Sequence, residues 1–366
     1  AQNAAFQTTN GLLPALAGSW PQDRPAICAV SAFGFTGTNS HLIVAAGPVT
    51  ARRSSGPHMP PVLALSARTD GDLDALARSY QAVLSEPGVS LEGLCFTAAC
   101  HRARFTSRMA VTGPDADSMS ERLAAKLAKG RGEGAPRALP VVFVFSGIGA
   151  LPPGLGTELY ARCEAYREVV EQLNPVVEKV CGRSASEILW NHEGRLLARS
   201  RYAHPALYVH QCALAAMWRA WGIEPAGVLG HSVGEFAAAT AAGVWTLADG
   251  LLLVAERARL IDDFCRPGRA INLFCSRAEA IELIGDRRDV WLAAENAPEL
   301  MLAAGTPEGI AELKARCQSR AVQSQDQFGE FAFHTPGMAG AAEALAEIVA
   351  RTPISAPQVK MISSVT

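Results

Sequence analysis

The chain has 366 residues, of which 49% are hydrophobic and 19% are charged, a balance typical of a globular protein and not of a disordered one. Its formal charge of −2 comes from 33 basic and 35 acidic residues and does not favour nucleic acid or an anionic membrane as a partner. The longest apolar runs, 140–145 and 251–255, are too short to cross a bilayer, and no basic segment leads into an apolar one at the N-terminus. We expect a soluble, cytoplasmic protein of two or three domains.

The nine cysteines are scattered and form no C-x-x-C pair. Cys95 and Cys100 share one predicted helix, with His101 as the neighbouring histidine, a spacing that does not suit zinc. We therefore expect reduced thiols in the core and no metal site.

The first 138 residues contain two small patterned regions separated by a linker. Residues up to about Ser19 carry no catalytic constellation. Two apolar runs, 27–31 and 41–44, predict strands joined by a glycine-rich turn, and the Pro/Gly/Ser/Arg-rich stretch 47–61 indicates a linker. A small mixed α/β unit follows, with strands expected at 62–66 and 107–112 and helices at 70–85, 91–101 and 118–129.

From residue 139 the pattern becomes that of a larger α/β domain. A buried strand is expected at 140–145, followed by a glycine-containing turn and then by helices over 155–181 and 204–221. Further along, a helix is expected at 249–261. The stretch 270–324 alternates in the order βαββαβ, which predicts an inserted ferredoxin-like unit; its strands are expected at 271–274, 290–295, 301–304 and 321–324, and its helices at 278–284 and 307–317.

The pentapeptide G-x-S-x-G at 230–234 follows an apolar run and precedes an alanine-rich segment. A strand, a sharp turn and a helix in this order are what a nucleophile elbow requires. Such a turn exposes the hydroxyl of Ser232 and directs the backbone N–H of Val233 toward a developing oxyanion. A serine needs a base to accept its proton, so a histidine elsewhere in the chain is also required. The alternative interpretation is a plain strand-to-helix turn whose serine caps the helix.

The chain resembles a known family in several motifs. GHSVGE at 230–235 resembles the GHSxGE motif of the malonyl-type acyltransferases of fatty acid and polyketide synthases. AFGFTGTNSH at 32–41 is similar to the closing hairpin of ketosynthases. The resemblance implies a fragment of a modular, type I polyketide synthase: a ketosynthase tail at 1–46, a small α+β linker domain at 47–138, and a C-terminally incomplete acyltransferase at 139–366. It implies an α/β-hydrolase-like core for the acyltransferase, with the ferredoxin-like subdomain inserted at 270–324.

The same resemblance assigns roles in catalysis. FAFHTP at 331–336 is similar to the family's AFHSP, which makes His334 the base of a dyad with Ser232. The oxyanion would be held by backbone N–H groups of Val233 and Ile148, although Ile148 replaces a family glutamine. Ser364 stands where the family has an asparagine or glutamine that orients the base.

The resemblance also assigns substrate-binding residues. Arg257 takes the position of the arginine that holds the free carboxylate of a malonyl substrate, whereas helix periodicity alone favours a solvated surface arginine. His204 replaces the glutamine of the family's QPAL segment, and His231 lies within the GHSxGE motif. Phe333, directly before the base, matches the malonyl form of the family, while Phe331 departs from both the malonyl and the methylmalonyl forms.

These residues predict an acyl-coenzyme A:acyl carrier protein transacylase with no permanently bound cofactor. Its substrates would be malonyl-coenzyme A and the phosphopantetheine thiol of an acyl carrier protein. Its further partner would be the ketosynthase of the same polypeptide, in a full-length protein that forms a homodimer. Two alternatives stay open. The first is a thioesterase-like hydrolase, because acidic residues lie between Ser232 and His334. The second is a catalytically impaired scaffold, because the family's glutamines are absent near Ile148 and its asparagine is absent at Ser364.

Overall fold

The structure is a computed structural model that describes residues 25–46, 59–129, 139–149, 151–190, 196–197, 199–327 and 329–365. The expected N-terminal segment up to Ser19 and most of the expected linker at 47–61 lie outside the described residues. The chain divides into two units, Ala1–Ser55 and Gly56–Thr366, and each is described by itself.

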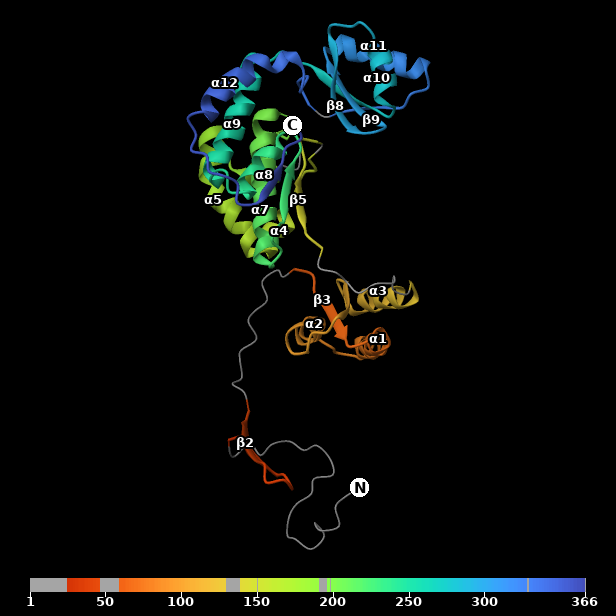
Figure 1. Cartoon of the computed structure of the whole chain (residues 1–366), viewed down its shortest axis with the longest axis vertical. Coiled ribbons are helices and arrows are strands. Elements are labelled where there is room, and N and C mark those ends of the chain that lie inside the picture. Colours follow the sequence, from red (N-terminus) through yellow and green to blue (C-terminus); the bar gives the residue numbers. More distant parts are fainter. Residues whose placement is uncertain are drawn as a thin grey trace. The chain divides into compact units, whose positions relative to one another are not determined.

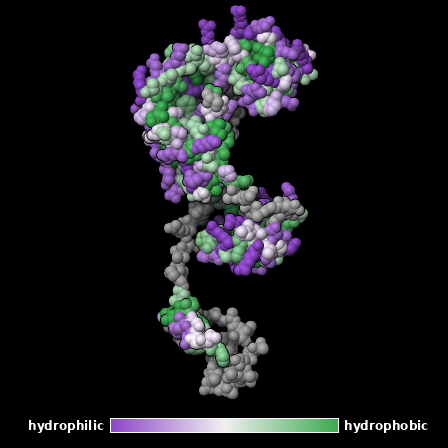
Figure 2. Space-filling view, viewed as in Figure 1, coloured by the Kyte–Doolittle hydropathy of each residue, from purple (hydrophilic) through white to green (hydrophobic). Residues whose placement is uncertain are grey.

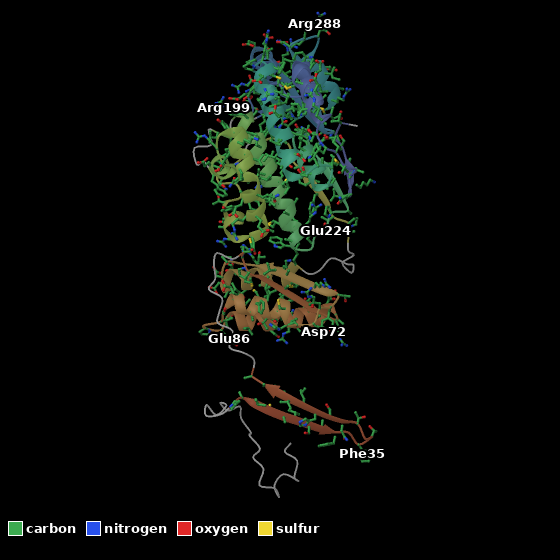
Figure 3. All side chains as sticks on the ribbon, turned by 90° about the vertical axis from the view of Figure 1, so that its left-hand side faces the viewer. Phe35, Asp72, Glu86, Arg199, Glu224 and Arg288 are labelled. Atoms are coloured by element: carbon green, nitrogen blue, oxygen red, sulfur yellow. The ribbon has the colours of Figure 1, made fainter. Side chains whose placement is uncertain are left out.

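The first unit contains a β-hairpin. Strand β1 (Ile27–Phe33) pairs antiparallel with β2 (Asn39–Ala45), and both strands extend further toward the turn than the sequence predicted. Phe35 lies in that turn with its side chain fully exposed (Figure 3). The described part of this unit therefore presents apolar side chains on its surface (Figure 2).

The second unit begins with a small α/β layer that contains every element expected between residues 62 and 129. Antiparallel strands β3 (Val62–Ala67) and β4 (Ser107–Thr112) pack against three helices: α1 (Asp70–Leu84), α2 (Leu91–Cys100) and α3 (Ala116–Lys129). In β3, Leu63, Leu65 and Ala67 are buried while the residues between them are more exposed, which is the alternation of a sheet with one covered face. The layer therefore has a core of its own.

The larger part is built on a parallel sheet of strand order β11-β6-β5, formed by β5 (Val142–Phe145), β6 (Gly227–Gly230) and β11 (Lys360–Ile362). Helices α5, α7, α8 and α9 gather on one side of β5 (Figure 1). The helices of this part are α4 (Thr157–Arg162), α5 (Glu164–Cys181), α6 (Ala185–Leu189), α7 (Ser200–Ala220), α8 (Gly234–Ala241), α9 (Leu247–Phe264) and α12 (Ala339–Val349), with a 3-10 turn, η2 (Pro336–Met338). Phe145 and Val228 are buried against this helical layer.

The single helix expected over 155–181 is wrong, because the chain breaks at Cys163. This residue is extended (φ −119°, ψ 112°) and separates α4 from α5. The guanidinium of Arg167 donates to the carbonyls of Tyr160 (2.8 Å) and Ala161 (3.4 Å), so the end of α4 has side-chain partners for its free carbonyls. Apolar periodicity carries no information about such a cap.

Helix α7 begins at Ser200, four residues before the predicted start, and contains Pro205. Proline has no N–H, so the carbonyl of Arg201 loses its helical partner. The thiol of Cys181 lies 3.5 Å from that carbonyl oxygen and donates to it. This contact from a distant element allows the helix to run through the proline.

The ferredoxin-like order predicted at 270–324 is present. Strands and helices follow as β7 (Arg269–Leu273), α10 (Arg277–Ile284), β8 (Val290–Ala297), β9 (Leu300–Gly305), α11 (Pro307–Ser319) and β10 (Ser324–Asp326), and the antiparallel sheet has the order β10-β7-β9-β8. The last strand starts later than predicted because α11 ends in a Schellman motif, with Ala321 at φ 55° and the N–H of Val322 bonded to the carbonyl of Cys317. Asn296 lies within β8.

None of the helices in the described ranges is both long enough and apolar enough to cross a membrane.

Candidate active site

The sharp turn after β6 holds Ser232 in a strained conformation. Ser232 has φ 53°, in the left-handed region that non-glycine residues seldom adopt. The flanking glycines are required by close packing: a Cβ on Gly230 would lie 2.3 Å from Cα of Glu235, and one on Gly234 would lie 2.3 Å from the carbonyl oxygen of Phe145. The strand, turn and helix expected around G-x-S-x-G are therefore present.

His334 is the histidine that meets Ser232. Its Nε2 lies 2.9 Å from Oγ of Ser232, within hydrogen-bond distance for proton transfer. His334 also has a positive φ, 59°, and precedes η2 by two residues. Burial, followed by electrostatic interactions with Arg257 and with the ring of His231, lowers the pKa of His334 below its usual value of 6.5, so the ring is neutral and able to accept a proton at neutral pH.

The loop after β5 lies against the nucleophile. A Cβ on Gly147 would lie 2.8 Å from the ring of His231 and 3.2 Å from Cβ of Ser232. Within the described ranges, the N–H groups of Val233 and Ile148 donate to no protein acceptor. Both are thus free to bind a developing oxyanion, and the side chain of Ile148 has no part in such a contact.

Arg257 is largely buried and makes its hydrogen bond to a neutral partner. Its Nη1 lies 3.1 Å from Nδ1 of His204, and its guanidinium lies 6.0 Å from the ring centre of Phe333. No carboxylate among the described residues lies within ion-pair distance of it. Burial lowers the pKa of Arg257 to about 10, so the guanidinium remains charged at neutral pH.

The neighbouring arginine, Arg259, differs from Arg257 in both exposure and partners. Arg259 is exposed and forms ion pairs with Glu256 (2.8 Å) and Asp263 (2.5 Å) on the same helix. The solvated helix face that spacing alone favours for Arg257 is therefore occupied by Arg259 instead.

Two cavities meet at this site. The larger has a volume of about 530 Å³ and is lined by residues that include Ser232, His231, His334, Arg257 and Asn296. The smaller, about 150 Å³, is mainly apolar and is lined by Phe333, Ile261, Met338 and Leu345 together with Arg257 and His334. Volumes of a few hundred Å³ suit small-molecule ligands. Four of the predicted site residues therefore share one cavity, while His204 is fully buried and lines neither cavity.

Ser364 contacts a different residue from the one expected. Its N–H and its hydroxyl donate to Oε1 of Glu235 over 2.8 and 2.7 Å, and the hydroxyl of Ser363 donates to the same carboxylate. Within the described ranges no hydrogen bond joins Ser364 to His334. The end of β11 is thus tied to the first turn of α8 through Glu235.

Two polar positions were missed by sequence reasoning. Gln211 is buried and its Nε2 donates to the carbonyl oxygen of Ser146 (2.7 Å), at the start of the loop that carries Ile148. Glu235, the last residue of GHSVGE, binds Ser363 and Ser364. Gln211 lies seven positions after His204, a spacing that puts both residues on one face of a helix. This spacing is the sequence feature that could have identified Gln211.

The chain is similar to known proteins over most of its length. Residues 142–366 match the family model described as acyl transferase domain, and residues 61–123 match one described as CurL-like, polyketide synthase C-terminal. The chain is 33% identical over 371 residues to the spectinabilin polyketide synthase system protein NorA' of Streptomyces orinoci, and 34% identical over 334 residues to erythronolide synthase EryA3 of Saccharopolyspora erythraea. These matches cover 95% and 86% of the chain but 10% of each relative.

Solved structures show the same α/β fold. The acyl transferase domain of SpnD, in complex with 2-(pent-4-yn-1-yl)malonyl, is 26% identical with a TM-score of 0.74, covering 85% of this chain and 74% of that one. The malonyl-CoA:ACP transacylase of Synechocystis is 28% identical with a TM-score of 0.55, covering 62% of this chain and 75% of that one.

The lowered pKa of His334 predicts the pH dependence of Ser232. Protonated His334 cannot accept the hydroxyl proton, so inactivation by phenylmethylsulfonyl fluoride should stay fast through neutral pH and slow on the acid side, with a midpoint below 6.5. Arg257→Ala removes a charge that lowers this pKa, so the midpoint should move to higher pH. Inactivation rates measured over acid to neutral pH check this. Arg259→Ala, the exposed control, should leave the midpoint in place, and an equal midpoint in wild type and Arg257→Ala contradicts the assignment.

Proposed function

Because the chain belongs to the acyl transferase domain family found in polyketide synthases, we propose that it transfers a carboxyacyl group from coenzyme A to the phosphopantetheine thiol of an acyl carrier protein. The contact between Ser232 and His334 carries this proposal, because it opens into the cavity that also contains a buried arginine with no carboxylate partner among the described residues. A nucleophile beside an uncompensated cation suits a thioester substrate with a free carboxylate.

The first half-reaction forms an acyl-enzyme. Oγ of Ser232 attacks the thioester carbonyl while Nε2 of His334 accepts the hydroxyl proton. The N–H groups of Val233 and Ile148 stabilise the oxyanion of the tetrahedral intermediate. The carbon–sulfur bond then breaks, and the proton held by His334 passes to the coenzyme A thiolate as it leaves.

The second half-reaction reverses these roles. His334 accepts the proton of the carrier thiol, whose sulfur attacks the ester carbonyl. The bond between the acyl carbon and Oγ of Ser232 then breaks, and the proton held by His334 passes to Oγ as the serine is released. No metal or redox group takes part in this sequence. The carrier protein is the expected partner in trans or on the same polypeptide, and the whole protein is proposed to contain a ketosynthase and to form a homodimer.

The two alternative functions fit the site less well. A hydrolase with a Ser–acid–His triad needs a carboxylate on Nδ1 of its histidine. Within the described residues no Asp or Glu hydrogen-bonds to His334, and Glu235 is engaged by Ser363 and Ser364. A scaffold that has lost catalysis does not require the 2.9 Å contact between Ser232 and His334.

Radiolabelling tests the proposed function directly. Incubation with radiolabelled malonyl-coenzyme A should label Ser232 in the unmodified protein and leave Ser232→Ala unlabelled. Ser232→Ala and His334→Ala should each reduce transfer to a carrier protein by several orders of magnitude, and the double variant should be little worse, because the two residues act as a unit. Near-normal transfer by folded His334→Ala protein would remove this residue from the mechanism.

Arg257 is proposed to hold the free carboxylate of the substrate. Arg257→Ala should weaken malonyl transfer by about 2 to 4 kcal/mol, since a charged partner is lost in a shielded site. Acetyl transfer should improve relative to malonyl transfer. Acylation rates with both thioesters give the ratio, Arg259→Ala serves as the surface control, and an unchanged ratio in Arg257→Ala argues against the clamp.

Phe333 is proposed to favour malonyl over methylmalonyl groups. Its ring lies beside the Arg257 guanidinium and 6.1 Å from the ring of Phe331, which is itself buried and supports Phe333 from the core. A carboxylate bound at Arg257 places the α-carbon of the substrate near Phe333. An α-methyl group then competes with the phenyl ring for space, which costs about 1 to 3 kcal/mol in a packed site.

Competition between malonyl- and methylmalonyl-coenzyme A measures this selectivity. The unmodified protein should prefer malonyl by roughly 5- to 150-fold, the range that corresponds to that steric cost. Phe333→Ser should partly relax the preference because it removes the ring. Preference for methylmalonyl by the unmodified protein would defeat the steric argument.

A further inference from the structure

The contact between His204 and Arg257 determines where the proton of the histidine lies. A guanidinium only donates hydrogen bonds, so Nδ1 of His204, 3.1 Å from Nη1 of Arg257, must be the acceptor. His204 is then neutral, with its proton on Nε2. Burial and the neighbouring charge of Arg257 lower the pKa of His204 well below its usual range, which agrees with a neutral ring.

His204 acts on the site only through Arg257. The residue has no exposed surface and lines neither of the two cavities, so it does not reach a ligand. Its Nε2 has no hydrogen-bond partner among the described residues, which is an unfavourable state for a buried donor. The bond to Arg257 is therefore the polar interaction that a histidine at this position supplies.

The identity of the partner matters for the charge of Arg257. A carboxylate at the position of His204 would hold the guanidinium and also neutralise it. A neutral imidazole holds it through a hydrogen bond and leaves the positive charge in place. Phe333, whose ring lies 6.0 Å from the guanidinium and 5.8 Å from the ring of His204, is likewise uncharged.

We propose that His204 is a positioning residue that sets the selectivity for carboxyacyl over plain acyl thioesters, because it orients Arg257 by a neutral acceptor and leaves the guanidinium charge for the substrate carboxylate. This inference rests on the function proposed above. It differs from the sequence-based expectation that His204 binds the substrate itself.

The test compares variants at His204 by their kcat and KM for acylation of Ser232 from malonyl- and acetyl-coenzyme A. His204→Leu removes the acceptor, so we expect KM for malonyl-coenzyme A to rise and the malonyl-to-acetyl ratio to fall about tenfold, the effect of losing one hydrogen bond to a charged group. Acetyl transfer should be unchanged. His204→Gln keeps an acceptor oxygen and should restore most of the ratio, and His204→Leu combined with Arg257→Ala should have the same ratio as Arg257→Ala alone.

His210 provides a matched control. It lies on the same helix, is buried, and bonds to the hydroxyl of Tyr166 over 2.6 Å, away from Arg257. His210→Leu should lower the unfolding temperature and leave the malonyl-to-acetyl ratio in place. Should His204→Leu fail to fold, His204→Met keeps the volume without an imidazole nitrogen and carries the same expectation.

The outcomes separate this inference from the proposed function. Equal losses of malonyl and acetyl transfer in His204→Leu, or additive losses of selectivity in the double variant, overturn the role of His204. If Arg257→Ala lowers the ratio while His204→Leu and His204→Met do not, the carboxylate clamp stands and only the His204 inference fails. If malonyl-coenzyme A does not acylate the unmodified protein, both fail.

Discussion

The reactive turn depends on three glycine positions at which backbone segments from different parts of the chain approach closely. At Gly230 the end of β6 packs against the start of α8, and at Gly234 the start of α8 packs against the end of β5. At Gly147 the loop that follows β5 packs against His231 and Ser232. A methyl group at any of the three would meet atoms at 2.8 Å or less. This packing surrounds Ser232, which has a positive φ and a hydroxyl oxygen 2.9 Å from Nε2 of His334.

The sequence predicted the elements better than their ends. Alternating or helical periodicity located most of the strands and helices, because periodicity reports which face is buried, but α6 and α12 were not predicted. The ends were missed where a side chain from elsewhere supplied the deciding contact: Arg167 at the end of α4, and Cys181 beside the carbonyl freed by Pro205. Ala321 adopts a left-handed conformation usually reserved for glycine, so local propensity did not indicate where α11 ends.

Part of the candidate site was predictable in its residues, but its contacts were not. G-x-S-x-G in its strand-to-helix context identifies Ser232 from local chemistry alone. His334 is 102 residues away in the chain, and only the family resemblance paired the two. Arg257 and Arg259 are two positions apart on α9, and their spacing shows that they point in different directions without showing which of them is buried. Ser364 and Glu235 meet because β11 lies beside β6, a pairing that no local pattern encodes.

The environment of the Arg257 guanidinium affects the stability of the folded protein. A cation that is only partly exposed and lies against a neutral ring and an aromatic face is less favourable than the same cation in solution. Nε2 of His204, which has no hydrogen-bond partner among the described residues, adds to this. The desolvation of this guanidinium, with no carboxylate within ion-pair distance among the described residues, therefore lowers the stability of the folded state. Under the proposed function this is a trade-off between stability and activity, because a guanidinium without a carboxylate partner among the described residues keeps its charge for an anionic substrate.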